Sequence, residues 1–336
     1  MSTPVIAVEG LRKSFRGKRK NDPAKVVLNG FDLSVAPGTV HALLGPNGAG
    51  KTTAVHILTT YLKPDSGRAS VAGHDVLAEP DRVRAAIGVT GQFSAVDWLL
   101  TGRENLQLMA DLYHLGKAEG RKVTDTLLER FDLVEAADKN SATYSGGMKR
   151  RLDLAMTLVA RPEVVFLDEP TTGLDPRSRR AMWDMVRELV AEGTTILLTT
   201  QMLEEADELA DRISVLDDGH IVAEGTVAEL KRRIPGGRIE VEFPDRTELD
   251  AAARILKVPT SESLTLRLPH DGDLRSLRAV LSSLDDAGVD VSSLTVQASD
   301  LDDVFFALTG HAAERADETG AAVVPYLQSI AKGGSR

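Results

Sequence analysis

The stretch Gly45-Pro46-Asn47-Gly48-Ala49-Gly50-Lys51-Thr52 follows the pattern G-x-x-x-x-G-K-T, which is typical of a phosphate-binding loop. Before it, the apolar run of residues 39–44 predicts a buried strand, and after it residues 52–58 predict the start of a helix. Glycines let the backbone N–H groups of such a loop face inward, and the helix N-terminus adds its positive dipole end. Lys51 can then reach the β- and γ-phosphates of a nucleotide, and the Thr52 hydroxyl can take a Mg²⁺ position. An ordinary glycine-rich turn is the alternative, but the strand and helix on either side favour the phosphate loop.

A second apolar run, residues 164–167, ends directly in Asp168-Glu169-Pro170. Four apolar residues followed by two acids predict a buried parallel strand that ends at a site. An Asp at the carboxyl end of such a strand, beside a phosphate loop, can hold Mg²⁺ through water. Glu169 can polarise an attacking water as a general base. The alternative is a capping Asp-Glu-Pro turn, which the phosphate loop upstream makes less favoured.

Other polar or aromatic residues stand where predicted elements begin or end. Gln92 follows a short strand at residues 87–90 and could ligate Mg²⁺ or orient water, although a Gln there is usually a loop residue. Gln201 follows a buried strand at residues 194–200. Phe15 could stack on a base or could simply be packed. Ser145-Gly146-Gly147 opens an apolar helix that runs to residue 159, so Ser145 is a natural N-cap and the glycines leave N–H groups free for an anion.

The predicted elements indicate an α/β fold. Strands alternate with helices from residue 39 to residue 225, which predicts a mainly parallel sheet. Residues 5–35 predict a small antiparallel sheet beside this core, with strands at 5–11, 26–28 and 31–35, and residues 101–140 predict a helical insertion.

Composition narrows the classes of function. The 336 residues carry 40 Lys and Arg against 50 Asp and Glu, a net charge of −10, which disfavours general nucleic-acid binding. With no cysteine, disulfides, thiolate metal sites and cysteine nucleophiles are excluded. No apolar run approaches the roughly 20 residues needed to span a bilayer, and residues 1–10 lack the apolar stretch of a secretory signal. We therefore expect a soluble intracellular protein.

The chain changes character after residue 230. Residues 231–237 read as a linker, and residues 238–243 and 263–268 alternate apolar and polar side chains like strands buried on one side. Helices are predicted at 249–256 and 274–284, and a third strand at 291–298. The Ala-, Gly- and Ser-rich remainder from His311 is predicted to be partly disordered.

Taken in order, these motifs resemble the ATPase subunit of ABC transporters over about residues 5–235. In that family the Ser-Gly-Gly helix of one subunit closes on the γ-phosphate held by the other. The resemblance implies ATP and Mg²⁺ as cofactors, with Thr52, Gln92 and Asp168 as metal-site residues. Glu169 and Gln201 are the implied catalytic residues. The implied nucleotide-binding residues are Phe15, Gly45, Pro46, Asn47, Gly48, Ala49, Gly50, Lys51, Thr52, Thr53, Gln92, Ser145, Gly146, Gly147, Asp168 and Asp175. Among them, Phe15 would stack on adenine, and Asp175 would help to shape the dimer interface.

Two residues depart from the usual family pattern. Tyr144 stands where Leu usually precedes Ser-Gly-Gly, and Gln201 stands where the switch His usually follows the Thr-Thr strand. With the surrounding residues 144–153 and 199–207, these departures are similar to the daunorubicin-resistance subgroup of bacterial drug exporters. The simple His-based account of hydrolysis does not carry over to Gln201.

The resemblance also implies a domain plan. We expect a P-loop ABC ATPase domain over residues 1–235 with a helical subdomain at about 93–143, an α+β accessory domain over 236–310, and a flexible tail over 311–336. Its core would combine a mainly parallel sheet with an antiparallel β subdomain.

In function, the resemblance implies an ATP-hydrolysing subunit that dimerises around two ATP molecules and binds no nucleic acid. It would drive a separately encoded ABC-2-type permease, sit at the cytoplasmic face of the cell membrane, and export a drug, antibiotic or lipid, as in antibiotic resistance. A soluble ABC ATPase not coupled to a transporter is the alternative. Such proteins usually carry long coiled coils or two cassettes, whereas this sequence has one cassette and no long heptad run.

Overall fold

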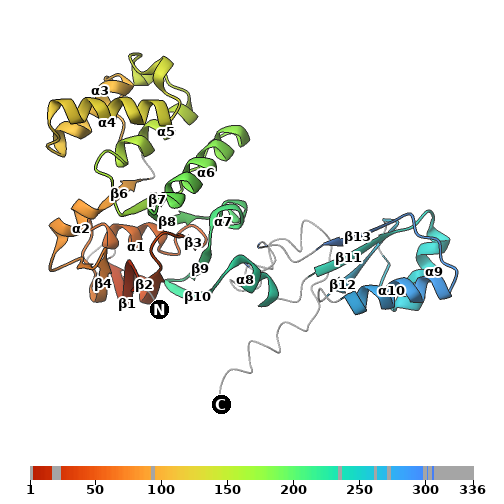
Figure 1. The fold of residues 1–336 in the computed structure, drawn as a ribbon. Coiled ribbons are helices and arrows are strands. Elements are labelled where there is room, and N and C mark those ends of the chain that lie inside the picture. The colour runs from red at the N-terminus through yellow and green to blue at the C-terminus, as the bar shows by residue number, and fades with distance from the viewer. Residues whose placement is uncertain are drawn as a thin grey trace. The chain divides into compact units, whose positions relative to one another are not determined.

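The computed structural model describes residues 3–16, 24–91, 95–233, 237–260, 263–270 and 274–297, together with Leu301 and Phe305. Gln92 and the tail from residue 311 lie outside the described residues. The chain divides into two compact units, Met1–Val227 and Ala228–Arg336, whereas the sequence analysis placed the boundary after residue 235 (Figure 1).

The first unit contains a six-stranded sheet in the order β10-β9-β3-β8-β7-β6. All neighbouring strands in it are parallel except the antiparallel edge pair β9 and β10. The strands are β3 (Val40–Leu44), β6 (Ile87–Thr90), β7 (Val164–Asp168), β8 (Thr195–Thr200), β9 (Arg212–Asp217) and β10 (His220–Gly225). Every residue of β3, β7 and β8 is buried, as expected for strands that are covered on both faces. The predicted, mainly parallel sheet is confirmed.

A second sheet in this unit is four-stranded and antiparallel, in the order β2-β1-β4-β5. It consists of β1 (Ile6–Phe15), β2 (Lys25–Val35), β4 (Ser66–Val71) and β5 (His74–Asp75). The strands that the sequence suggested at residues 26–28 and 31–35 are one continuous β2, because register shifts absorb the irregular stretch between them. The sheet shares one hydrophobic core with α1 (Lys51–Leu58) and the large sheet, through residues such as Phe31, Ile57 and Phe166.

Helices complete the first unit: α2 (Pro80–Ala86), α3 (Gly102–Leu112), α4 (Lys117–Arg130), α5 (Gly146–Thr157), α6 (Pro176–Ala191) and α7 (Leu203–Leu209). The helical insertion predicted over residues 101–140 contains α3, α4 and the short 3₁₀ turn Val134–Ala136. A capping box between Thr101 and Glu104 starts α3. Figure 1 shows α3, α4 and α5 grouped to one side of the two sheets.

The second unit begins with α8 (Val227–Arg233) and contains a three-stranded antiparallel sheet in the order β12-β11-β13. Its further elements are β11 (Gly237–Glu242), α9 (Arg246–Leu256), β12 (Thr265–His270), α10 (Leu274–Asp286) and β13 (Ser293–Gln297). Alternate strand residues such as Val241 and Leu266 pack with Leu249 and Ala252 of α9 in a core of their own. Glu240 and Arg267 are ion-paired at 2.8 Å between neighbouring strands.

Within the described residues, no helix is long and apolar enough to cross a membrane.

Candidate active site

Part of the predicted site lies at one edge of the large sheet, where parallel strands end together: the phosphate loop, the acids Asp168 and Glu169, and Gln201. Strand β8 lies between β3 and β7, with Thr200 beside Leu44 and Thr199 beside Asp168. The loop after β3 and the acids after β7 therefore stand on either side of the end of β8. This is the edge at which open α/β sheets bind ligands.

The loop of residues 45–50 requires glycine at its two ends. A Cβ at Gly45 would overlap the carbonyl oxygen of Leu216. Gly50 has a φ of +112°, and a Cβ there would lie 2.8 Å from the carbonyl oxygen of Val27 in β2. The Gly45 N–H donates to the Thr200 carbonyl at 3.3 Å, which joins the loop to β8. These close approaches fix the loop against β2, β8 and β9.

The other residues of the predicted phosphate loop lie between its two ends and in the first turn of α1. Gly48 also has a positive φ of +87°, and the Ala49 N–H donates to the Pro46 carbonyl at 3.3 Å. Asn47 is exposed at the tip of the loop, and Thr53 is in the first turn of α1.

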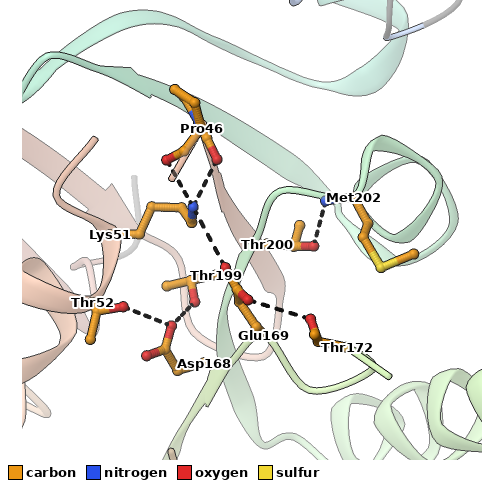
Figure 2. Close-up of polar contacts among 10 residues, drawn as sticks. Pro46, Lys51, Thr52, Asp168, Glu169, Thr172, Thr199, Thr200 and Met202 are labelled. Atoms are coloured by element: carbon orange, nitrogen blue, oxygen red, sulfur yellow. Dashed lines mark hydrogen bonds and ion pairs between the residues drawn. The ribbon is translucent and has the colours of Figure 1, made fainter. Parts of the chain in front are cut away.

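Lys51 is buried at the start of α1 and points back across the loop (Figure 2). Its Nζ donates to the carbonyl oxygens of Gly45 at 2.8 Å and Pro46 at 3.1 Å, and lies 3.8 Å from Oε1 of Glu169. Burial lowers the pKa of Lys51, and the negative charges of Glu169 and Asp168 act in the opposite direction. The ammonium group is thus desolvated and held by weak acceptors that a phosphate oxygen can replace.

Asp168 and Thr52 come together beside this cation. The Thr52 hydroxyl lies 3.4 Å from Oδ1 of Asp168, and the Thr199 hydroxyl donates to the same carboxylate oxygen (Figure 2). Hydroxyl and carboxylate oxygens are ligands that Mg²⁺ accepts, usually together with substrate phosphates. Thr52 and Asp168 therefore fit a divalent cation. Thr199 was not predicted as a site residue, because a Thr inside an apolar strand is common and gives no sign of a site.

Glu169 has an unusual backbone conformation. Its φ is +50°, which is uncommon for a residue with a side chain. Such a conformation persists only where surrounding contacts hold it, and here two hydrogen bonds do so. The Glu169 N–H donates to the Thr199 carbonyl at 3.0 Å, and the Thr172 hydroxyl lies 3.4 Å from Oε2. The carboxylate is largely buried beside Lys51 and can accept a proton from a water at the γ-phosphate position.

Gln201 differs from the acids because its side chain is exposed directly after β8. The Met202 N–H donates to the Thr200 hydroxyl at 2.9 Å, which shapes the turn around it. Behind this turn, Glu205 of α7 is buried, and its Oε1 accepts from the Thr171 hydroxyl at 2.7 Å. Burial raises the pKa of Glu205, and its hydrogen bond from Thr171 opposes that rise. The sequence analysis missed Glu205, because an acid among the other acids of α7 gives no sign of its buried bond to Thr171.

Ser145, Gly146 and Gly147 stand at the start of α5. The Ser145 hydroxyl accepts from the Met148 N–H at 3.2 Å, as predicted for an N-cap. Gly147 packs so closely on α6 that a Cβ would lie 2.6 Å from Oγ of Ser178. Asp175 caps α6, accepting from the Ser178 N–H at 3.0 Å and from its hydroxyl at 2.6 Å. Among the described contacts, no hydrogen bond or ion pair joins these residues to the phosphate loop of the same chain.

Tyr144 and Phe15 have different surroundings in the structure. Tyr144, where the family pattern has Leu, is buried and donates its hydroxyl to the Ala136 carbonyl at 2.6 Å, so it anchors α5 to the helical insertion. Phe15 is 42% exposed at the end of β1, and Lys13 Nζ lies 5.6 Å from its ring centre. Its ring is therefore available for stacking.

A cavity of about 530 Å³ lies away from this site. It is lined by α4, by the residues before β7 and β8, and by charged groups such as Arg130, Glu163 and Glu192. The residues before β7 and β8 are at the opposite ends of these strands from Asp168 and Thr200, so the cavity is separate from the phosphate loop. The candidate site is defined by its chemistry and not by an enclosed volume.

Comparison with known proteins finds many similar chains. The sequence pattern of the family described as ABC transporter matches residues 28–172. The chain is 50% identical to the daunorubicin resistance ATP-binding protein DrrA3 of Streptomyces coeruleorubidus, covering 92% of this chain and 97% of that protein. It is 46% identical to the doxorubicin resistance ATP-binding protein DrrA of Mycobacterium tuberculosis, covering 91% and 93%. It is 38% identical to the Nod factor export ATP-binding protein I of Burkholderia orbicola, covering 88% and 96%.

Solved structures are similar to about two thirds of this chain. The structure of an ATP-binding subunit of an ABC transporter is 29% identical, with a TM-score of 0.59, and covers 68% of this chain and 92% of that one. An ATP-binding cassette of an ABC transporter in its ADP conformation is 27% identical, with a TM-score of 0.60, and covers 68% and 93%.

Proposed function

The chain belongs to the family of ABC-transporter ATP-binding proteins and is an ATP-hydrolysing subunit; from that premise we propose that it powers drug or lipid export through a separate membrane permease. The observation that carries the catalytic part of the proposal is the cluster of Lys51, Asp168 and Glu169 around the end of β8. The relatives named for daunorubicin and doxorubicin resistance support a drug as the cargo. The relative named for Nod factor export supports export of a cargo other than these drugs.

In the proposed reaction, this chain's residues position ATP and activate water. The loop N–H groups and Lys51 hold the phosphates, because a buried cation and free backbone donors both favour an anion. Phe15 stacks on the adenine. Glu169 accepts the proton of the attacking water, and Gln201 contacts the γ-phosphate from the other side of the strand end. Asp175 shapes the interface with a second subunit.

Mg²⁺ is proposed at Thr52 and Asp168, whose oxygens lie 3.4 Å apart. When bound, the ion would neutralise charge on the β- and γ-phosphates. Gln92, the third metal residue implied by the sequence, lies outside the described residues.

Dimerisation is proposed because the helix start at Ser145-Gly146-Gly147 is exposed and has no described bond to its own phosphate loop. A second copy could present this helix start to the γ-phosphate, where free N–H groups favour an anion. Each of two ATP molecules would then contact both subunits.

A surface on the helical insertion supports the permease partner. Trp98, Leu99, Leu108, Leu112 and Tyr113 are large hydrophobic residues with substantial exposure, and Leu99 is 86% exposed. We propose that these side chains form a protein-contact surface, because large apolar side chains exposed to water are a feature of such contacts. A cytoplasmic helix of an ABC-2-type permease fits this surface, and docking there would place the subunit at the cytoplasmic face of the membrane. The accessory domain of residues 236–310 and the tail of 311–336 remain proposed assignments.

The test is transport in inverted membrane vesicles that contain this chain together with a candidate multi-span permease from the same organism. ATP-dependent accumulation of daunorubicin should require both proteins and should be lost in Glu169→Gln. A fluorescent lipid offered in the same vesicles separates a lipid cargo from a drug cargo. ATPase activity that supports no accumulation of either cargo in these vesicles would favour the alternative, a soluble ABC ATPase that is not coupled to a transporter.

A further inference from the structure

Arg150 and Asp153 lie one turn apart on α5, and neither belongs to the phosphate loop, the strand-end acids or the Ser-Gly-Gly start. Both are removed from water: the Asp153 side chain is 2% exposed and the Arg150 side chain is 12% exposed. They form an ion pair, with Arg150 Nη1 3.3 Å from Asp153 Oδ2. Burying charges is costly unless every charged group is satisfied. We therefore expect this pair, on the helix that Ser145 caps, to have a role other than stabilising the helix.

The Arg150 guanidinium bonds backbone groups on both sides of Glu169. Its Nε donates to the Pro170 carbonyl at 2.7 Å, and its Nη2 donates to the Asp168 carbonyl at 3.3 Å. Glu169 is the single residue between these two carbonyls, and it has the positive φ of +50°. A planar guanidinium with several fixed donors can hold such a backbone in place, which an ammonium group cannot do in the same way.

The same pair also reaches the segment after β6. Arg150 Nη1 donates to the Gly91 carbonyl at 3.0 Å, and Oδ1 of Asp153 accepts from the Ala95 N–H at 2.9 Å. Gly91 and Ala95 are the described residues that flank positions 92–94. One turn of α5 therefore joins the end of β7 to the end of β6.

We propose that Arg150, aligned by Asp153, is a positioning residue that couples the start of α5 to the carboxylate of Glu169. The inference rests on the proposed role of Glu169 as the base. Ser145 and Arg150 are on one rigid helix, so a partner nucleotide that engages the start of α5 also shifts the backbone that carries Glu169. Arg150 acts on the orientation of Glu169 and not on the binding of ATP, whose contacts are made by the loop of residues 45–52.

The experiment measures kcat and KM for MgATP, and nucleotide affinity, in Arg150→Gln, Arg150→Lys and Asp153→Asn of the full chain. We expect kcat to fall about 10- to 100-fold in Arg150→Gln, since a misplacement of about 1 Å can cost that much. KM and affinity should stay within about threefold, because the phosphate contacts are intact. Arg150→Lys should recover part of kcat, as it restores the charge but not the fork of donors.

Arg151→Gln is the matched control on the same helix. Arg151 also bonds backbone carbonyls and an acid, donating to the Phe131 carbonyl at 2.9 Å and to Asp132 Oδ2 at 2.9 Å, but these belong to the helical insertion. Losing a half-buried arginine that bonds backbone carbonyls would affect both variants, whereas losing the positioning of Glu169 affects the Arg150 variant alone. In a Glu169→Gln background, Arg150→Gln should lower the residual rate no further, because both act on one step.

Each outcome decides between the possibilities. Equal kcat in Arg150→Gln and wild type, an equal loss in Arg151→Gln, or a further loss in the Glu169→Gln background would overturn the inference. If Arg150→Gln does not fold, Arg150→Lys and Asp153→Asn decide it by the same split between kcat and KM. If Glu169→Gln hydrolyses ATP as fast as the wild type, the result would instead contradict the role of Glu169 in the proposed function.

Discussion

The two parts of the proposed nucleotide site differ in how far a single chain completes them. At the ends of β3 and β7, the largely buried Lys51 and Glu169 are ion-paired, Lys51 also bonds the loop, and the buried Asp168 accepts from the Thr199 hydroxyl. At the start of α5, Ser145 and the two glycines after it are neutral, and the serine hydroxyl caps its own helix. The charged groups at the strand ends are already held in place by contacts within one chain. The start of α5 is a capped helix end that needs no nucleotide to be stable.

The difference follows from desolvation. A buried ammonium or carboxylate must find a partner within its own chain, so folding alone assembles Lys51 with Glu169 and Asp168 with Thr199. A helix start exposes its first N–H groups to water at little cost and can wait for an anion. Mutations in the first part should therefore affect binding or chemistry in each subunit, while mutations at the start of α5 should affect association.

The largest expected effect is on hydrolysis by Glu169→Gln. Replacing the base should lower steady-state ATPase activity about 100- to 10,000-fold, while ATP binding stays intact because the phosphate contacts remain. ATP should then accumulate a closed dimer, visible by size-exclusion chromatography with MgATP, with the permease present if closure requires it. A variant that hydrolyses ATP at the wild-type rate would remove Glu169 from the chemistry.

Gln201→Ala should have the next largest effect. If the Gln201 amide donates to the γ-phosphate, its loss should reduce turnover by roughly 10- to 1000-fold, as for other transition-state donors. Gln201→His should keep activity and add a pH dependence near the imidazole pKa of about 6.5, with activity changing as the ring gains a proton below that pH. Steady-state ATPase activity across pH for the three proteins measures this. Wild-type turnover in Gln201→Ala would make the residue a bystander.

Lys51→Ala tests binding by the charged groups at the strand ends. Loss of a charge-assisted phosphate contact of about 1.5–3 kcal/mol should weaken ATP affinity roughly 10- to 150-fold. Isothermal titration with ATP measures it, and Lys63→Ala, which removes an exposed lysine of the same unit, is the control. Equal affinity in Lys51→Ala and wild type would contradict the phosphate assignment.

Two changes at Ser145 test the start of α5. Ser145→Ala should cost about 0.5–2 kcal/mol of unfolding free energy through the lost cap, with ATP affinity of the monomer unchanged. Ser145→Arg, placed in the Glu169→Gln background, should prevent the ATP-dependent dimer because of its bulk. Chemical denaturation and size-exclusion chromatography read out the two effects. A dimer that persists with Arg at this position would argue against the shared site.

The smallest effect is expected from removing the second unit. A chain that ends at Arg233 should fold and bind ATP like the full chain, because Lys51, Asp168 and the first unit's core all lie upstream. Circular dichroism and ATP titration test this. An insoluble product would mean that the two units depend on each other to fold.

Much of the site was predictable because its signals are local. The glycines, Lys51 and Thr52 follow in one short stretch, and an apolar run ending in two acids is legible without any partner. Ser145 was likewise predictable as a residue that begins a helix, and it caps α5. The limits of β2 were predicted less well, because a continuous strand with register shifts looks like two short strands.

Thr199, Glu205, Arg150 and Asp153 could not be found in this way. Each is defined by a partner distant in sequence: Thr199 by Asp168, Glu205 by Thr171, and Arg150 by carbonyls of residues 91, 168 and 170. An arginine in an amphipathic helix reads as a surface residue until the packing shows what its guanidinium touches.

The sequence by itself determined the phosphate loop, the strand-end acids and the class of fold, because glycine conformation, strand burial and charge at a strand end are properties of adjacent residues. Only the tertiary structure decided which groups share a contact: that β8 lies between β3 and β7, that Lys51 lies 3.8 Å from Glu169, and that Arg150 bonds both sides of that glutamate. Strand order and helix packing bring together residues more than a hundred positions apart, and no local pattern encodes that proximity.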